Sequence, residues 1–206
     1  MPIMNRATLG RAMKKLAAMD EDVARALEAV GLPEPRTRPA GFSTLLATIV
    51  GQQISAEAAR TILGRVEALL ADPSPEALLR LRNPTLRKAG MSMRKVEYAK
   101  GLAKAIVSGE FDVDGLADLE DEEAIEAITA LRGFGRWSAE IYLMFSLGRR
   151  DIFPSGDLAL RVAAGRLKGM EERPTPRQAD ELVAHWSPYR SAGALFLWHY
   201  YRGAPT

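Results

Sequence analysis

The stretch LRGFGRWSAE, at residues 131–140, contains groups that can bind an anion. Gly133 and Gly135 flank Phe134 in a tight turn, and an apolar helical pattern begins directly afterwards. Unpaired amides at the start of a helix lie at the positive end of its dipole, where they bind phosphate without a charged side chain. Helix, glycine hairpin and helix is also a known DNA-binding arrangement, in which the anion is a backbone phosphate. The alternative is an ordinary helix–helix loop with a glycine cap.

One carboxylate, Asp157, stands out in the segment DIFPSGDLALRV, twenty residues after Trp137. Pro154 and Gly156 favour a loop, and Asp157 directly precedes an apolar helical pattern. This position fits an ordinary helix N-cap. It also fits a carboxylate held in a cleft with one side open, where it is available for chemistry. Both interpretations stay open on these residues alone.

Other reactive side chains are scarce in this chain. There is no cysteine, which excludes disulfides, thiol nucleophiles, Cys-ligated zinc and iron–sulfur clusters. The two histidines, His185 and His199, have no acidic residue at metal-ligand spacing, so we expect structural roles for both. The sequence contains no GxxxxGK[ST] loop that would indicate an ATP site.

The elements that position these residues are predicted to be helical almost throughout. Apolar residues recur at i, i+3, i+4 and i+7 in several segments, and clusters of proline and glycine separate them. Helices are predicted at 121–131 and 136–147, and the stretch 138–147 is apolar on nearly all sides, as in a central buried helix. The short EFDVD alternation is too brief to build a sheet. The predicted fold class is therefore all-α, with about ten helices.

Length and charge limit the function further. The 206 residues suffice for one domain, or for two small lobes that share a core. The net charge is only +2, but eight Lys/Arg and one acid lie between Arg80 and Lys104, whereas nine acids and no base lie between Glu110 and Glu126. Such segregation can present a basic face to nucleic acid, although solvated helix faces explain it equally well. No signal peptide or membrane span is expected, which predicts a cytoplasmic protein, or a nuclear one in a eukaryote.

Taken together, these motifs resemble the helix-hairpin-helix (HhH-GPD) superfamily of DNA glycosylases. LRGFGRWSA followed by FPSGDLALR is similar to the hairpin and the Gly/Pro-rich loop with its Asp in that superfamily. The stretches LLATIVGQQISAEAA, GMSMRKVEYAKGLA and WSPYRSAGALFLWHYY resemble its 3-methyladenine DNA glycosylase II branch, in a compact form. The resemblance implies one glycosylase domain over 1–206, with two helical lobes and a cleft between them. Residues 1–40 would form a helix and loop packed on the core, and 121–147 the hairpin.

The resemblance implies that Asp157 is the catalytic carboxylate. A fixed carboxylate stabilises the positive charge that develops on deoxyribose as a base departs, and it can orient the attacking water. Trp137 stands where relatives with lyase activity carry a lysine, so the implied enzyme hydrolyses the glycosidic bond without nicking the strand. The implied substrates are alkylated purines, 3-methyladenine and 7-methylguanine, flipped out of double-stranded DNA in base excision repair.

The resemblance also assigns a pocket for the flipped base. Trp137 offers an aromatic face, on which a cationic methylated purine gains stacking and cation–π attraction. Trp198 matches a second aromatic residue of the pocket. Ile141 lies one helical turn after Trp137, at a place where some relatives carry an aromatic residue. For Trp198 and Ile141 the alternative is plain core packing.

The remaining implied contacts are with the DNA backbone and with the gap left by the flipped nucleotide. Gln52 and Gln53 stand where relatives carry a wedge residue, and a capping turn with Ser55 as N-cap is the alternative. The implied phosphate contacts come from Gly133, Gly135, Arg136 and Ser138. The main-chain carbonyls implied to bind Na⁺ or K⁺ are those of Thr129, Leu131 and Phe134. No other cofactor is expected.

Two other functions remain open at this point. A glycosylase of the same fold could act on hypoxanthine or ethenoadenine instead of alkylated purines. A non-catalytic helix-hairpin-helix protein could bind damaged or bent DNA. Asp157 argues against the second function, because a binding protein has no need of a carboxylate that repels phosphate. In every case the expected partner is double-stranded DNA, bound by a monomer.

Overall fold

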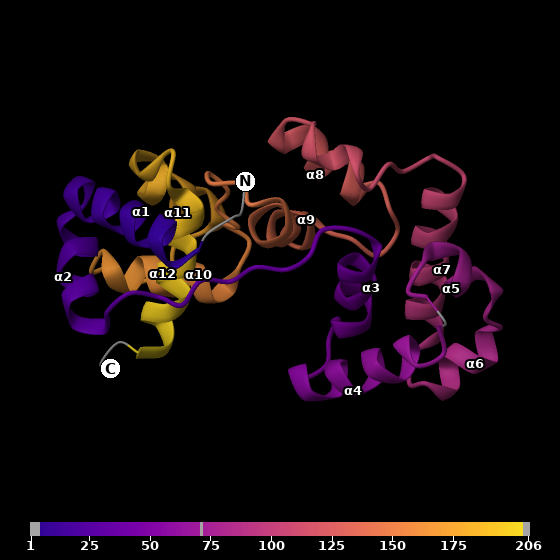
Figure 1. Cartoon of the computed structure of the whole chain (residues 1–206). Helices are drawn as coiled ribbons and strands as arrows, with labels where there is room; N and C mark the ends of the chain where they lie inside the picture. The colour runs from indigo at the N-terminus through magenta and orange to yellow at the C-terminus, as the bar shows by residue number, and fades with distance from the viewer. Residues whose placement is uncertain (1–4, 71, 204–206) are drawn as a thin grey trace. The chain divides into compact units, whose positions relative to one another are not determined.

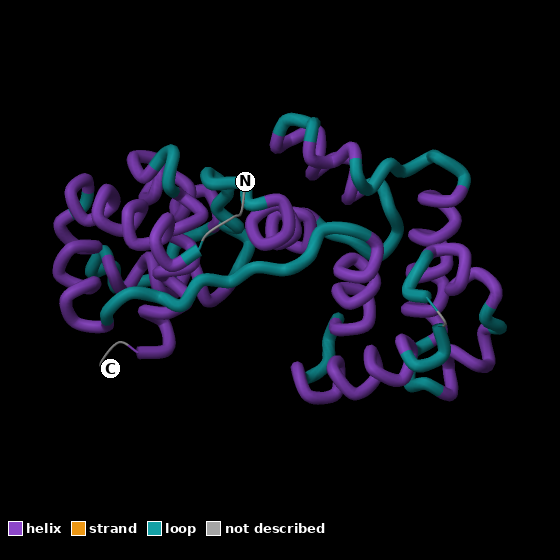
Figure 2. The backbone as a smooth tube through the Cα atoms, viewed as in Figure 1, coloured by secondary structure: helices purple, strands orange, loops and turns teal. Residues whose placement is uncertain are grey.

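The computed structural model describes residues 5–70 and 72–203, and every regular element in these ranges is helical (Figure 1 and Figure 2). The predicted all-α class is therefore confirmed. These ranges contain twelve α-helices, where the sequence pattern indicated about ten. The difference arises from short elements such as α5 (Pro75–Arg80) and α6 (Asn83–Lys88). Each has six residues, too few to display a clear 3.6-residue period.

The chain divides into two compact units. We call Arg38–Tyr142 the central unit, and Met1–Thr37 together with Leu143–Thr206 the terminal unit. The helices of the terminal unit are α1 (Arg6–Met19), α2 (Glu21–Val30), α10 (Leu158–Leu167), α11 (Pro176–Val183) and α12 (Arg190–Gly203). The helices of the central unit are α3 (Phe42–Gly51), α4 (Ala56–Glu67), α5, α6, α7 (Met93–Val107), α8 (Asp121–Thr129) and α9 (Arg136–Tyr142).

The N-terminal segment differs from the single helix and loop expected over 1–40. It forms two helices, because Asp20 interrupts the helical backbone with an extended conformation. The Asp20 carboxylate then accepts hydrogen bonds from the amides of Asp22 (3.1 Å) and Val23 (3.3 Å) and so caps α2. An N-cap in the middle of a continuous apolar pattern is easily mistaken for a helical residue.

The core of the terminal unit is built around α12, which packs against α1, α2 and α10. Trp186 and Phe196 are among its fully buried side chains. Gly193 lies directly against the indole of Trp186, where any Cβ atom would clash with the ring. The glycine at position 193 thus allows α12 to approach the ring of Trp186 closely.

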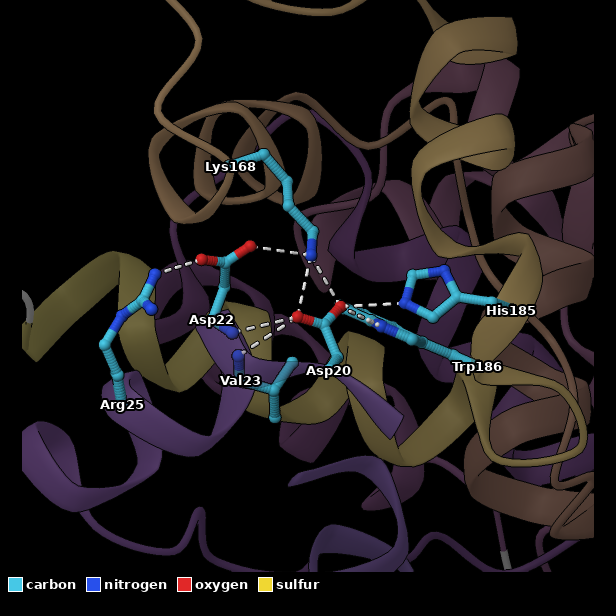
Figure 3. A network of polar contacts seen from close by, with 7 residues as sticks. All are labelled: Asp20, Asp22, Val23, Arg25, Lys168, His185 and Trp186. Atoms are coloured by element: carbon cyan, nitrogen blue, oxygen red, sulfur yellow. Dashed lines mark hydrogen bonds and ion pairs between the residues drawn. The ribbon is translucent and has the colours of Figure 1, made fainter. Parts of the chain in front are cut away.

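A polar network around the buried carboxylate of Asp20 joins three parts of the terminal unit (Figure 3). The Asp20 carboxylate accepts hydrogen bonds from the ammonium of Lys168 (2.6 and 2.7 Å) and from the indole of Trp186 (2.7 Å), and it lies 2.9 Å from Nε2 of His185. Burial raises the pKa of Asp20, but the hydrogen bonds from Lys168, Trp186 and His185 outweigh burial and lower that pKa to about 2. His185 therefore has the structural role expected of it.

The central unit is organised by α7, which packs against α3, α5 and α6. Serine N-caps begin several of its helices, including Ser55 before α4 and Ser92 before α7. Lys100 donates hydrogen bonds to the carbonyls of Leu79 (3.2 Å) and Leu81 (2.5 Å), which satisfies acceptors at the end of α5.

The two hairpin helices are shorter than predicted. The first ends at Thr129 instead of residue 131, and the second is α-helical only from Arg136 to Tyr142. It continues as a π-helical segment over Leu143–Leu147, all but the last residue of which are buried. A stretch that is apolar on nearly all sides does not distinguish α from π geometry, because it has no polar face to mark the period. Single π turns inside helices are frequent at functional sites.

Candidate active site

Asp157 is the N-cap of α10, and its carboxylate Oδ1 accepts the amide hydrogen of Leu160 at 3.0 Å. The side chain is half-buried. A second donor reaches the same oxygen, because the indole Nε1 of Trp198 lies 3.3 Å from Oδ1. The structure thus brings together two predicted site residues that are 41 positions apart in the sequence. Capping and a site role are both compatible with this geometry.

The loop that carries Asp157 is fastened to the start of α12. Arg190 pairs with both oxygens of Asp151 at 2.9 Å, and the hydroxyl of Ser187 donates to the same carboxylate at 2.7 Å. The hydroxyl of Ser191 accepts the amide hydrogen of Ile152 at 2.9 Å. The resemblance to the family pointed to this C-terminal segment, but the sequence did not predict its contacts with the loop. No local pattern reveals a contact between segments about forty residues apart.

Trp198 is held in place by packing as well as by this hydrogen bond. Its ring lies 5.9 Å from that of Phe145, measured between centroids, at an interplanar angle of 40°. The ring is half-buried, and the preceding residue, Leu197, is fully buried. The next residue, His199, places Nε2 2.8 Å from the carbonyl of Val30, a structural contact. The orientation of the indole is therefore set by α12 and its neighbours.

In the central unit, the glycine hairpin joins α8 to α9. Gly133 adopts a φ of +100°, and a Cβ atom there would clash with the ring of Tyr98 on α7. Gly135 has open space around its Cα. Its carbonyl accepts the amides of Ser138 (2.9 Å) and Ala139 (3.2 Å), so the amide of Ser138 is already engaged. The earlier amides of the first turn of α9 have no intrahelical acceptor, as at any helix start.

Arg136, predicted to contact phosphate, forms ion pairs with two carboxylates. It makes paired hydrogen bonds with Glu122 at 2.6 and 2.9 Å, and another with Glu140 at 3.0 Å. Hydrogen bonding from Arg136 lowers the pKa of Glu122. These contacts link α8 to α9 across the hairpin, so the guanidinium stiffens the element and would have to share its charge with a phosphate.

Trp137 and Ile141 share the next turn of α9 but differ in exposure. Trp137 is 47% exposed, so part of its side chain lies at the surface. Ile141 is 8% exposed, so it contributes mainly to the core. Tyr142 follows, and its hydroxyl accepts the amide hydrogen of Gly41 at 2.7 Å.

The two glutamines after α3 have different environments. The amide Nε2 of Gln52 donates to the carbonyl of Gly133 at 2.7 Å and so ties this loop to the hairpin. Gln53 is exposed and adopts a φ of +58°, a conformation that costs energy for a residue with a Cβ atom. Ser55 caps α4 by accepting the amide hydrogen of Ala58 at 3.2 Å, as the alternative interpretation expected. Of the pair, Gln53 has the accessible side chain.

A lysine that the sequence analysis did not assign to the site supports the same loop. The ammonium of Lys95, on α7, donates to the carbonyl of Val50 at 2.7 Å, near the end of α3. Burial lowers the pKa of Lys95. Because Val50 comes shortly before Gln52, this bond fixes the base of the loop. The spacing of Ser92 and Lys95 indicates a helix cap, but it gives no signal for the contact of Lys95 with Val50, 45 residues away.

The main-chain carbonyls predicted to bind a monovalent cation, those of Thr129, Leu131 and Phe134, lie at the end of α8 and in the turn after it. Carbonyls in the last turn of a helix lack intrahelical donors, which leaves those near the end of α8 available, including Thr129. The carbonyl of Leu131 accepts the amide of Phe134 at 3.2 Å and keeps its second lone pair. Within residues 5–70 and 72–203 there is no cluster of three His, Asp or Glu side chains that could hold a metal ion.

The helical fold agrees with the comparisons to known proteins. The chain belongs to the HhH-GPD superfamily of base excision DNA repair proteins, whose family model matches residues 46–188. Among curated proteins, it is 30% identical to DNA-3-methyladenine glycosylase 1 of Schizosaccharomyces pombe, over 93% of this chain and 87% of that protein.

Solved structures give the same assignment. A crystal structure of a DNA-3-methyladenine glycosidase from Bacillus halodurans has a TM-score of 0.81 and 37% identity, and the match covers 91% of this chain and 87% of that one. The Schizosaccharomyces pombe 3-methyladenine DNA glycosylase in complex with abasic DNA has a TM-score of 0.80 and 29% identity, over 91% and 95% of the chains. In the part of the chain that the structure describes, no helix is long and apolar enough to cross a membrane.

Proposed function

We propose that this protein is a monofunctional DNA glycosylase that removes alkylated purines, 3-methyladenine and 7-methylguanine, and leaves an abasic site. The observation that carries the proposal is the half-buried carboxylate of Asp157, which receives the indole N–H of Trp198 in a chain of the base excision repair family. The names of the relatives support the choice of alkylated bases. The partner is double-stranded DNA, which a monomer would bind.

The proposed chemistry is hydrolysis of the bond between base and deoxyribose. As this bond lengthens, positive charge builds on the sugar, and the carboxylate of Asp157 stabilises that charge. Water then attacks the anomeric carbon, and the same carboxylate orients it and accepts its proton. A purine alkylated at N3 or N7 is already cationic and departs as a neutral base, so no second acid is required.

The aromatic and hairpin residues hold the DNA during this step. Trp137 stacks on the flipped base, and its indole cannot form the Schiff base that a lysine would form, which supports hydrolysis without strand cleavage. First-turn amides of α9, with Gly133 and Gly135, bind a backbone phosphate. Gln53 fills the gap in the duplex. Main-chain carbonyls at the end of α8 would hold a monovalent cation that offsets their negative ends near the phosphate.

The proposal is tested by measuring release of free base from methylated duplex DNA, with later alkali treatment to reveal abasic sites. We expect wild-type protein to release methylated purines and Asp157→Asn to be slower by at least about a hundredfold. Strand breaks should appear only after alkali. Asp180→Asn, an exposed aspartate on α11, is the matched control and should retain full activity.

Two results would redirect the proposal. Release of hypoxanthine or ethenoadenine, but not of methylated purines, would assign another lesion to the same site. Duplex binding by both proteins without release of any of these bases would favour a non-catalytic binding protein. Strand breaks before alkali would contradict the monofunctional mechanism.

A further inference from the structure

The carboxylate of Asp157 receives two donors on one oxygen. The amide of Leu160 comes from the first turn of α10, and the indole N–H of Trp198 comes from α12. The χ2 bond of a carboxylate has a broad rotamer preference, so a helix cap alone restrains its plane only weakly. A second donor from another helix restricts that rotation. The plane of Asp157 is thus defined by two elements at once.

The same arrangement occurs a second time in the terminal unit. Asp20 is also an N-cap, and it also accepts an indole N–H, from Trp186 at 2.7 Å (Figure 3). The Asp20–Trp186 pair is buried, and Lys168 and His185 also contact the Asp20 carboxylate. This pair has a structural role. Asp157, by contrast, is only half-buried. The two sites share a donor–acceptor pair and differ in access.

We propose that Trp198 is a positioning residue for the reaction, and that it acts through its indole N–H on the carboxylate of Asp157. This inference rests on the proposed glycosylase function. An indole nitrogen donates and never accepts, so in this contact the Oδ1 atom of Asp157 is the acceptor. Packing against Phe145 and within α12 fixes the indole in advance. The indole nitrogen thus sets the angle of the carboxylate, while the ring belongs to the proposed base pocket.

The N–H and the ring can be separated by one substitution. Trp198→Phe keeps an aromatic ring against Phe145 and removes the donor. If the ring alone mattered, this variant would retain its activity. With the N–H as the positioning group, the single-turnover rate of base release from a duplex containing 7-methylguanine should fall about tenfold to hundredfold. Affinity for a duplex with a tetrahydrofuran abasic analogue should stay within about twofold, because binding to that analogue does not depend on the angle of the carboxylate.

The matched control is Tyr200→Phe. Tyr200 is also a half-buried aromatic residue on α12, stacked on Phe196, and the change also removes one polar hydrogen while keeping a ring. Its rate of base release should match that of the wild type. A full rate in Trp198→Phe would overturn the proposal. Equal losses in rate and in affinity for the abasic analogue would also overturn it, because they would indicate a merely structural role.

A spectroscopic test does not depend on activity. The chain has three tryptophans, so a ¹⁵N-labelled sample gives three indole N–H signals, which single Trp→Phe variants assign. In Asp157→Asn the acceptor becomes neutral and weaker, so the Trp198 proton signal should move upfield while that of Trp186 stays in place. If the Trp198 signal does not move, the hydrogen bond between Trp198 and Asp157 is refuted. If the wild-type protein releases no base but this signal still moves, the hydrogen bond between Trp198 and Asp157 is confirmed. The proposed function and the positioning role of Trp198 are then both refuted.

Discussion

Asp157 combines two tasks that can be separated by chemistry. As an N-cap it accepts an amide hydrogen, a task that asparagine performs about as well as aspartate. As the proposed catalytic group it must carry a negative charge, which asparagine lacks. The residue is therefore capable of being structural and catalytic at once, and the two interpretations of the sequence do not compete.

We predict that Asp157→Asn and Asp157→Ala both lose at least about a hundredfold in rate. The asparagine variant should be as stable as the wild type, whereas the alanine variant should be less stable by about 1 kcal/mol. The difference arises because alanine leaves the amide of Leu160 without its cap. Urea unfolding of the three proteins measures the free energies. An Asp157→Asn variant that is destabilised as much as the alanine variant would show that the charge, and not the cap, stabilises α10.

Gln53 is the residue that we expect to enter the duplex, because its side chain is exposed whereas that of Gln52 is tied to Gly133. Gln53→Gly removes the wedge and suits the positive φ, so the loop should keep its shape. Base release from a paired lesion should slow about tenfold. The loss should be smaller opposite an abasic site, where little unstacking is needed. An equal loss on both substrates would assign the defect to the loop itself.

At the scale of the element, the two glycines of the hairpin, Gly133 and Gly135, are subject to different structural constraints. Gly133 requires a left-handed backbone and a close approach to Tyr98, whereas Gly135 has neither constraint. We predict that Gly133→Ala lowers the free energy of unfolding by about 1–3 kcal/mol. Gly135→Ala should leave stability unchanged and weaken binding to every duplex, because its methyl group would stand where the phosphate approaches. Equal effects of the two changes on stability would contradict this division.

The ion pairs of Arg136 lead to a prediction about salt. If the guanidinium leaves Glu122 for a phosphate, Arg136→Ala should weaken duplex binding and reduce the slope of log K against log salt by about 0.9. The control is Arg177→Ala on α11, which breaks a comparable pair with Glu181 and should not change the slope. An unchanged slope in Arg136→Ala would restrict Arg136 to stiffening the hairpin.

The spacing of apolar residues predicted most of the helices, and it succeeded where a regular pattern extends over several turns. Regular apolar spacing predicted that the chain is helical in several segments, and the glycines predicted the turn between α8 and α9. Pattern failed for the Asp20 break between α1 and α2, and for the π-helical segment 143–147, because in each the apolar period continues through the change. The candidate residues came from resemblance, but the bond between Trp198 and Asp157 joins distant segments and required coordinates.

At the scale of the whole molecule, the polar network around Asp20 stabilises the terminal unit in a pH-dependent way (Figure 3). The pKa of Asp20 lies at about 2 in the folded state, below its ordinary value of 3.8. Since the folded pKa is depressed, the stability from this group is fully present above pH 3.8. It is lost as the pH falls from 3.8 towards 2, and it amounts to about 2 kcal/mol.

We predict that Lys168→Met lowers the free energy of unfolding at neutral pH by about 3 kcal/mol, because the charge of Asp20 stays buried without its ammonium partner. Urea titrations at neutral pH and at pH 3 would measure this. The difference between variant and wild type should shrink at the lower pH, where Asp20 begins to protonate. Lys14→Met, an exposed lysine on α1, is the control and should be nearly neutral.

The terminal unit is assembled from both sides of the chain, and this has a consequence for how the protein is made. The central unit is one continuous stretch, so it can collapse as soon as the ribosome has released it. Helices α1 and α2 are synthesised first but must wait for α10 and α12, their packing partners more than 120 residues later. Until then their apolar faces remain uncovered. Slow translation through residues 143–200 would therefore lengthen the interval in which the nascent chain is exposed to aggregation and to chaperones.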